Sequence, residues 1–301
     1  MKKIDISVCL CTYNRLEMLR NTLDSLLKQQ TDGLLSYEII IVDDGSSDGT
    51  KEFLKFISTN IGVNIKCFFE KRAGVAGARN RGVIESRGQW IAFIDDDEIV
   101  ESNYLQEIFD VATKNGADCV GGSLKLLFPS GYETALSGTS RKYFAETTKL
   151  GWFQQRYNYL GPGTGFALVR RALFDQIGFF DTSLKVKGED QDFFRRARKA
   201  GYKTVFAPQA IVHHVIPEDR LQPTYLLSQA RSWGTSIAYF DLKEWGRYKT
   251  IYICVLRIVH AILITAPSLF LASLQRNSRK ILSCRCSLIT AFAYIRQTIF
   301  S

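Results

Sequence analysis

The stretch Trp90-Ile91-Ala92-Phe93-Ile94-Asp95-Asp96-Asp97 is an apolar run that ends in three consecutive aspartates. A short apolar run of this kind is typical of a buried strand, so the carboxylates are expected at one edge of a sheet. Adjacent carboxylates repel one another and are costly to desolvate. They persist most readily where a hard divalent cation or a sugar hydroxyl compensates them. The stretch therefore predicts a polar binding site at a strand end.

Strand-like and helical patterns alternate through the first 120 residues. The predicted strands are 6–12, 37–42, 65–69, 90–94 and 119–122, and the predicted helices are 16–29, 50–58, 77–86 and 104–114. This alternation indicates parallel βαβ units and hence an α/β protein with a mixed, mainly parallel sheet flanked by helices. In open sheets of this type the ligand lies at the carboxyl ends of the strands. Thr12-Tyr13-Asn14, Asp43-Asp44 and the three aspartates all fall there.

The next part of the chain is less regular. Residues 125–160 hold scattered glycines and aromatics, and we expect a long excursion over the site in which side chains from Tyr132 to Tyr159 stack on sugar faces. Regular structure is predicted again at 163–169, 170–176 and 188–200, where Gly201 ends the last helix.

Cysteine usage and the N-terminus indicate the compartment. The seven cysteines are an odd number and several lie in apolar runs, which is typical of free thiols in a reducing cytosol. Met1-Lys2-Lys3 leads directly into an alternating Ile4-Asp5-Ile6 pattern without a long apolar segment, so no secretion signal is expected. A cytoplasmic location follows.

The positive charge is concentrated at the C-terminal end. From Arg220 onward there are 11 Lys/Arg and 2 Asp/Glu, a surplus of +9 that equals the net charge of the whole chain. The same region holds the most hydrophobic stretch, Ile251 to Leu274. An anionic membrane surface explains this combination better than nucleic acid, for which no recognition motif is present.

Whether this stretch crosses a membrane is a separate question. Arg257 costs about 2.5 to 3.5 kcal/mol at a helix centre, and a helix that ended at Pro267 would be shorter than a hydrocarbon core of about 30 Å. Basic residues flank both ends, so both are expected in the cytoplasm. We expect a re-entrant or interfacial helical hairpin at the cytoplasmic face. The alternative is a buried core helix of a soluble subdomain.

Two further motifs suit a nucleotide and its phosphates. Asp44, at the end of the strand 37–42, has a carboxylate able to accept the imide N–H of a uracil. Arg79 belongs to Arg72-Ala73-Gly74…Arg79-Asn80-Arg81-Gly82, where small residues and arginines at a helix start suit phosphate oxygens.

The carboxylates and a histidine pair supply the remaining chemistry. Mg²⁺ or Mn²⁺ prefers oxygen ligands, so Asp97 is the first candidate metal ligand and Asp95 binds ribose or metal. In the segment 188–192 Asp190 is the candidate base for an acceptor hydroxyl, with Glu189 beside it as a second candidate catalytic residue. In the pair at 213–214, one of the two imidazoles is a candidate to complete the metal coordination.

Taken together, these motifs resemble family 2 glycosyltransferases with the GT-A fold, and the resemblance covers residues 6 to 215. It rests on Thr12-Tyr13-Asn14-Arg15, Val42-Asp43-Asp44-Gly45-Ser46, Ala78-Arg79-Asn80-Arg81-Gly82, Asp95-Asp96-Asp97, Gly163-Thr164-Gly165-Phe166-Ala167 and Gly188-Glu189-Asp190. The hydrophobic tail is similar to that of membrane-associated bacterial members that act on lipid-linked or cell-surface glycans.

The resemblance implies an inverting, metal-dependent transfer from a nucleotide-diphosphate sugar, with UDP favoured. It places Asp44 on the base, Asp95 and Asp97 at ribose and metal, His214 as a late metal ligand, and Asp190 as catalytic base. The residues implied in donor binding are Thr12, Tyr13, Arg15, Asp44, Arg79, Asp95 and Asp96. It implies a transferase domain at 1–219, with a donor half at 1–124 and an acceptor half at 125–219, followed by a membrane-associating tail at 220–301. Residues 163–167 would line the acceptor pocket, and Cys11 departs from the pattern where a proline is common.

Two other functions use similar residues. A sugar nucleotidyltransferase would need an arginine-containing glycine-rich loop near the first strand, which Cys9 to Arg15 lacks. A non-catalytic nucleotide-sugar sensor would bind the donor and tolerate loss of Asp190.

Overall fold

A computed structural model describes residues 3–31, 33, 35–60, 64–147 and 162–301 of the 301-residue chain. The chain forms two compact units. The first comprises Met1–Lys125, Thr147–Ser183 and Glu189–Val215, and the second comprises Leu126–Glu146, Leu184–Gly188 and Ile216–Ser301. All the residues predicted to form the site belong to the first unit.

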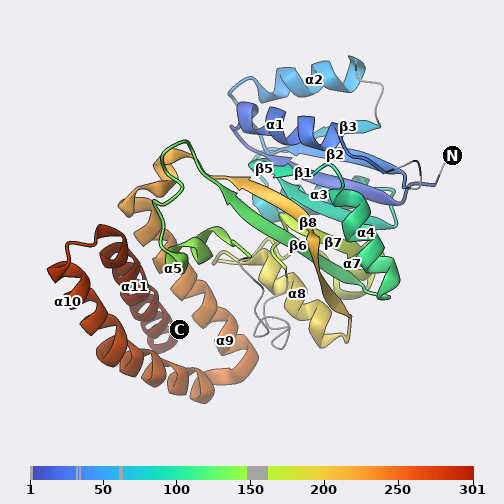
Figure 1. Cartoon of the computed structure of the whole chain (residues 1–301). Coiled ribbons are helices and arrows are strands. Elements are labelled where there is room, and N and C mark those ends of the chain that lie inside the picture. Colours follow the sequence, from blue (N-terminus) through green and yellow to red (C-terminus); the bar gives the residue numbers. More distant parts are fainter. Residues whose placement is uncertain (1–2, 32, 34, 61–63, 148–161) are drawn as a thin grey trace. The chain divides into compact units, whose positions relative to one another are not determined.

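The first unit is built on a sheet of eight strands within the described part of the chain (Figure 1). The strands are β1 Ile6–Thr12, β2 Tyr37–Asp43, β3 Ile65–Phe69, β4 Trp90–Asp95, β5 Glu98–Val100, β6 Cys119–Leu127, β7 Phe166–Arg170 and β8 Thr204–Val215, in the order β3-β2-β1-β4-β7-β6-β8-β5. The pairs among β3, β2, β1 and β4 are parallel, and the pairs β4–β7, β6–β7 and β5–β8 are antiparallel. The predicted mixed α/β sheet is confirmed.

Helices connect and cover these strands. They are α1 Leu16–Leu27, α2 Thr50–Asn60, α3 Gly74–Glu85, α4 Tyr104–Lys114, α7 Ala172–Ile177 and α8 Glu189–Lys199. Most lie within two or three residues of their predicted bounds. As predicted, α8 is followed by Gly201, whose φ of 84° is the left-handed conformation that ends helices.

Close packing brings α3 against the sheet. A Cβ at Gly82 would lie 2.1 Å from Sγ of Cys9 on β1, so only glycine permits this approach. The helix that carries Arg79 is thereby held directly on the central strand. The seven cysteines are all free, in agreement with the predicted thiols.

An aromatic cluster fixes α8. Phe193 on α8 stacks on Phe174 of α7 at 4.7 Å between ring centroids and lies 5.0 Å from Phe180, which in turn meets Phe93 of β4 at 5.4 Å. All four rings are buried. Because large rings pack in few arrangements, the first turn of α8 has a defined position relative to β4.

The second unit is mainly helical. It contains α5 Gly138–Arg141, the 3₁₀ helices η1 Lys142–Phe144 and η2 Glu218–Leu221, α9 Pro223–His260, the π-helical turn η3 Ala261–Thr265, α10 Ala266–Leu274 and α11 Ser278–Phe300. Gly246, with φ 74° and ψ 177°, leaves the helical conformation and divides α9 into two segments. Figure 1 shows a sharp bend between the labels α9 and α10.

The expectation that the apolar helix ends at Pro267 is wrong. The π-helical turn η3 precedes Pro267 and places it in the first turn of α10, where a missing backbone N–H breaks no helical hydrogen bond. Helical structure therefore continues from residue 247 to Leu274, which is about 42 Å at 1.5 Å per residue. Within the described residues one helical stretch, Pro223–Leu274, is long and apolar enough to cross a membrane, and 11% of its most apolar window is buried.

Helix α11 packs along the first segment of α9. A Cβ at Gly234 would lie 2.3 Å from the carbonyl oxygen of Thr290, and Oγ1 of Thr290 donates to the carbonyl of Ala230 at 3.1 Å. Further along, the hydroxyl of Tyr294 donates to Asp241 at 2.9 Å. Helix α11 and the first segment of α9 thus form a helical pair, with the segment from residue 247 to Leu274 packed on it. The hairpin expected within 251–274 is not found, because helical structure continues through Pro267.

Candidate active site at the carboxyl edge of the sheet

The three aspartates form the turn between β4 and β5. Asp96 and Asp97 are buried, with 4% and 6% of their surface exposed. One guanidinium nitrogen of Arg15 donates to both, at 2.8 and 3.0 Å, and the hydroxyl of Thr12 donates to Asp96 at 2.8 Å. Burial raises the pKa of Asp96 to about 6 in spite of the opposing charge of Arg15. The structure therefore brings Thr12, Arg15, Asp96 and Asp97 together.

Arg79 joins the aspartate turn to α8. Its guanidinium donates to Asp95 at 2.8 Å and to Glu189 at 2.6 Å, and the arginine is only 5% exposed. Burial opposes the charged form of Arg79, but the two carboxylates outweigh it and hold its pKa above the ordinary value. Three predicted site residues from α3, β4 and α8 are thus one ion-pair network.

Asp190 follows Glu189 in the first turn of α8 and is half-buried. Burial, and next the charge of Glu189, raise the pKa of Asp190 to about 6. One of its carboxylate oxygens accepts the backbone N–H of Gln191 at 2.7 Å. A carboxyl group with this pKa is ionised at neutral pH and is a stronger base than an exposed aspartate.

His214 meets Asp97 at the end of β8. Nε2 of His214 lies 3.5 Å from Oδ2 of Asp97, and the N–H of Val215 donates to the Asp97 carbonyl at 2.8 Å. His213 points elsewhere, since its Nε2 lies 2.7 Å from Glu101. Of the two histidines, His214 is therefore the one placed at the aspartate turn.

This pair suits a metal only in part. No group of three or more His, Cys, Asp and Glu side chains in the described part of the chain has the arrangement of a metal site. Neighbouring ligands of an octahedral ion lie about 3 Å apart, so Asp97 and His214 fit two adjacent positions. Mg²⁺ and Mn²⁺ commonly take the remaining positions from substrate phosphates and water, so the residues present are compatible with such an ion. The side chain of Asp95 pairs instead with Arg79.

The loops that follow β1 and β2 form the other end of the site. Both carboxylate oxygens of Asp44 accept backbone N–H groups at the start of α3, from Ala73 at 2.6 Å and from Gly74 at 3.0 Å. The guanidinium of Arg72 lies 4.4 Å above the ring of Tyr13 and bonds its hydroxyl. Asp44 and Tyr13 thus converge on the same loop, residues 72–74.

Glu98 is a site residue that the sequence reasoning missed. It is 2% exposed, and its carboxylate accepts the backbone N–H of Asp95 at 2.9 Å. A Cβ at Gly165 would lie 2.2 Å from Oε1 of Glu98. Burial, and next the charge of Asp95, raise the pKa of Glu98 well above its ordinary value. The available signal was an acid following three others at the start of a short apolar strand.

Glu98 also gives the segment 163–167 a defined place. Phe166 and Ala167 open β7, which pairs with β4, while Gly165 lies against the Glu98 carboxylate. The predicted acceptor-lining segment is thereby next to the aspartate turn. Of the aromatics predicted to stack on sugars, those from Trp152 to Tyr159 lie outside the described residues.

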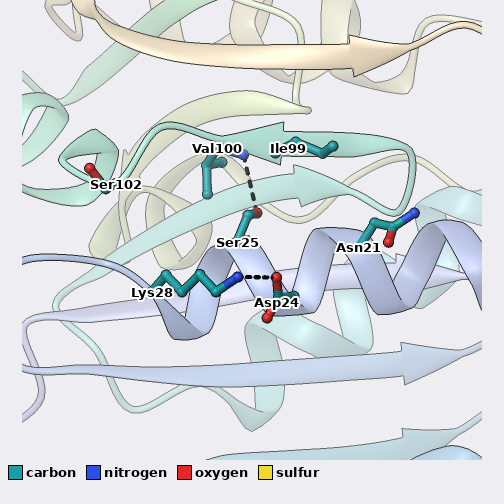
Figure 2. Close-up of a pocket in the computed structure, with 7 residues that line it drawn as sticks. All are labelled: Asn21, Asp24, Ser25, Lys28, Ile99, Val100 and Ser102. Atoms are coloured by element: carbon teal, nitrogen blue, oxygen red, sulfur yellow. Dashed lines mark hydrogen bonds and ion pairs between the residues drawn. The ribbon is translucent and has the colours of Figure 1, made fainter. Parts of the chain in front are cut away.

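A separate pocket of about 310 Å³ lies between α1 and β5. Figure 2 shows its lining, in which Asp24 pairs with Lys28 on α1 and the N–H of Val100 donates to Oγ of Ser25 at 3.2 Å. None of the predicted site residues lines it. The bond from Val100 to Ser25 joins β5 to α1, whereas the Asp24–Lys28 pair links successive turns of the α1 region.

The fold and the order of these motifs match a known family. The sequence pattern described as "Glycosyl transferase family 2" matches residues 7–178, more than half of the chain. The chain belongs to this family. The resemblance inferred from the motifs is confirmed, and the matched range contains every predicted site residue except Glu189, Asp190 and His214.

Relatives of known name agree with this assignment. Over 210 residues the chain is 30% identical to "Glycosyltransferase AglE" of Haloferax volcanii, covering 69% of this chain and 66% of the relative. Over 226 residues it is 30% identical to "Succinoglycan biosynthesis protein ExoM" of Rhizobium meliloti, covering 74% and 70%. The match thus leaves about a third of each relative outside the compared region.

A solved structure shares the fold. S. aureus TarS 1–349 in complex with UDP superposes with a TM-score of 0.54 and 18% identity, covering 99% of this chain and 92% of that one. The complex of the same protein with UDP-GlcNAc gives 0.54 and 20%, covering 79% and 67%. At this identity the likeness establishes the GT-A type of fold.

The contact between Gly165 and Glu98 predicts a non-additive pair of substitutions. Gly165→Ala should lower the free energy of unfolding by about 1–3 kcal/mol, because the new methyl group overpacks against a buried carboxylate. In a Glu98→Ala background the same change should cost less, since the obstructing side chain is gone. Denaturant unfolding of the four proteins measures this difference. An equal cost in both backgrounds would show that another contact requires glycine at 165.

Proposed function

We propose that this protein transfers a sugar from a UDP-sugar to a hydroxyl of a glycan or lipid-linked acceptor during synthesis of a polysaccharide or cell-surface glycan. The observation that carries the proposal is the buried Arg79, which ties Asp95 on the donor side to Glu189, the neighbour of the candidate base. Donor-binding and proton-accepting groups therefore belong to one network. Family membership supports the reaction class, and the relative named for succinoglycan biosynthesis supports the product class.

The donor is proposed to lie along the edge from Tyr13 to Asp97. The base would stack near Tyr13 and donate its imide N–H to Asp44, whose two oxygens keep free lone pairs beside the N–H groups they already accept. Arg15 and Arg72 bring positive charge to this edge for the diphosphate. The UDP complexes of the TarS fold support uridine as the base.

A divalent cation, Mn²⁺ or Mg²⁺, is proposed to bind through Asp97 and His214, with Asp95 close by. It would supply positive charge next to the diphosphate as that group leaves. Asp96 contributes differently, because it is held by Thr12 and Arg15 and so orients the turn.

The transfer itself requires a single base. The acceptor oxygen attacks the anomeric carbon, the bond from that carbon to the phosphate oxygen breaks, and UDP leaves with the electron pair. The acceptor proton passes to Asp190, and the configuration at the anomeric carbon inverts. Burial, and next the charge of Glu189, keep the pKa of Asp190 near 6, so it accepts the proton at neutral pH. Arg79 holds Glu189, the chain neighbour of Asp190.

Donor binding predicts a metal-dependent stabilisation. UDP with Mn²⁺ should raise the melting temperature of the full-length protein, because the ligand binds only the native state. Asp97→Ala should abolish the part of the shift that depends on Mn²⁺. Asp118→Ala, at a partly exposed carboxylate paired with Arg170, is the matched control and should retain it. A fully retained shift in Asp97→Ala would remove Asp97 from the metal site.

The base assignment predicts both a variant and a pH profile. Asp190→Asn should keep the UDP shift and lower kcat by roughly 10²–10⁴-fold, because the proton acceptor is lost. In the unsubstituted protein kcat at saturating donor should fall about tenfold per pH unit below about 6, where Asp190 becomes protonated. Unchanged turnover in Asp190→Asn would overturn the assignment of Asp190 as the base. Donor binding without turnover in the unsubstituted protein would support the non-catalytic sensor instead.

We also propose that the tail associates with the cytoplasmic face of an anionic membrane. From Tyr248 to Leu274 the exposed side chains are mostly large and apolar, and basic residues flank both ends. Arg285 and Arg296 are exposed on α11, which opposes α11 crossing beside α10, since arginine costs about 2.5–3.5 kcal/mol at a bilayer centre. An orientation in the membrane interface satisfies both observations.

Membrane association predicts a position-specific effect of one charge. Leu263 lies within η3 and is 68% exposed. Leu263→Glu should release the protein from anionic vesicles, because a carboxylate would have to enter the lipid. Phe56→Glu on α2 of the first unit, at a 64% exposed side chain, is the control and should leave binding unchanged. Co-sedimentation measures both. Binding that survives in Leu263→Glu would place the lipid contact elsewhere.

A further inference from the structure

Arg257 is turned into the helical unit. In the sequence, Arg257 is a charge that opposes insertion of this helix into a membrane. In the structure its guanidinium lies 4.1 Å above the ring of Tyr294 on α11. Its Nε is fully buried and has no hydrogen-bond partner among the described residues. A buried N–H without an acceptor is costly, so this atom is suited to a ligand oxygen.

A second cation shares this region of the unit. Lys142 in η1 is half-buried, and its Nζ lies 5.1 Å from the ring of Tyr143. Burial, and next the positive charge of Arg257, lower the pKa of Lys142. Two like charges are therefore close enough to repel each other within the same unit.

Helix α11 sets the two cations along one face. The hydroxyl of Tyr143, the neighbour of Lys142, lies 2.9 Å from Oγ1 of Thr290. Thr290 precedes Tyr294 by four residues, so both belong to the same face of the helix. The ring of Tyr143, next to Lys142, and the ring of Tyr294, beneath Arg257, therefore lie at neighbouring turns of α11.

Neither cation has an ion pair with a carboxylate in the described part of the chain. The nearby Asp241 accepts from the hydroxyl of Tyr294 at 2.9 Å and does not pair with Arg257. The segment 148–161 contains no Asp or Glu in its sequence. Half-buried charges of one sign without a counterion are unfavourable, which points to an external anion.

We propose that Lys142 and Arg257 bind the phosphate of an amphiphilic phosphomonoester, a membrane lipid with an exposed terminal phosphate. The proposal rests on the membrane association proposed for the tail and adds the class of lipid that the tail recognises. An arginine fork combined with a lysine point charge suits a phosphate group. The exposed Val255, Leu256 and Ile258 beside Arg257 suit the attached lipid chain.

The test uses full-length protein and vesicles of phosphatidylcholine that contain either phosphatidic acid or phosphatidylglycerol at equal surface potential. Lys142→Gln and Arg257→Gln should each weaken binding to phosphatidic acid vesicles about tenfold more than binding to phosphatidylglycerol vesicles. The reason is that each variant loses one charge-assisted hydrogen bond to the phosphate. Arg285→Gln, at an exposed position of α11, is the control and should weaken both about equally. Arg257→Lys should restore part of the preference.

The outcomes separate the possible explanations. Equal weakening on both vesicle types in all three glutamine variants would overturn the site and leave general attraction to anionic lipid. Inorganic phosphate alone could stabilise the unsubstituted protein and fail to stabilise Lys142→Gln. In that case the ligand is free phosphate and the lipid assignment is wrong. Lys142→Gln leaves the packing of α9 on α11 intact, so it is informative even if Arg257→Gln does not fold. The UDP shift of each variant, measured in parallel, shows whether the donor site is intact, so failure of this proposal is distinct from failure of the transferase proposal.

Discussion

The first unit depends on one buried arginine. Arg79 reaches Asp95 and Glu189 from a helix that glycine at 82 allows to lie directly on β1. Removing Arg79 would leave these two carboxylates without this cation, which is costlier than loss of an exposed ion pair. The same interaction joins segments that are more than 100 residues apart in the chain. The geometry of the candidate site and local stability therefore rest on the same three side chains.

Positive groups already compensate the acidic residues of the site. Arg15 holds Asp96 and Asp97, Arg79 holds Asp95 and Glu189, and backbone N–H groups hold Asp44. This explains how several carboxylates can be gathered at one sheet edge without ligands. It also means that a donor and its metal would exchange partners with these groups, so that binding and rearrangement of the aspartate turn are coupled.

The second unit is shaped by its exposed apolar surface. Its helices turn an apolar surface outward, while Gly246 and the π-helical turn η3 allow the chain to bend at one point and to pass a proline at another. Tyr143 and the rest of Leu126–Glu146 pack with α9 and α11 in one hydrophobic cluster. Part of the segment expected over the site thus belongs to the same core as the apolar helices.

The sequence by itself determined the α/β alternation, the bounds of most strands and helices, the family and the loops that meet at the sheet edge. These follow from local patterns: apolar runs, caps and turn residues that act within a few positions of one another. It did not disclose the role of Glu98, the pairing of Arg79 with Glu189, or the choice of His214 over His213, because each depends on contacts between distant segments. The continuation past Pro267 and the inward position of Arg257 also required the tertiary structure, since a π-helical turn and an aromatic partner on another helix decide them. Periodicity fixes which residues share a face, and only packing decides what that face meets.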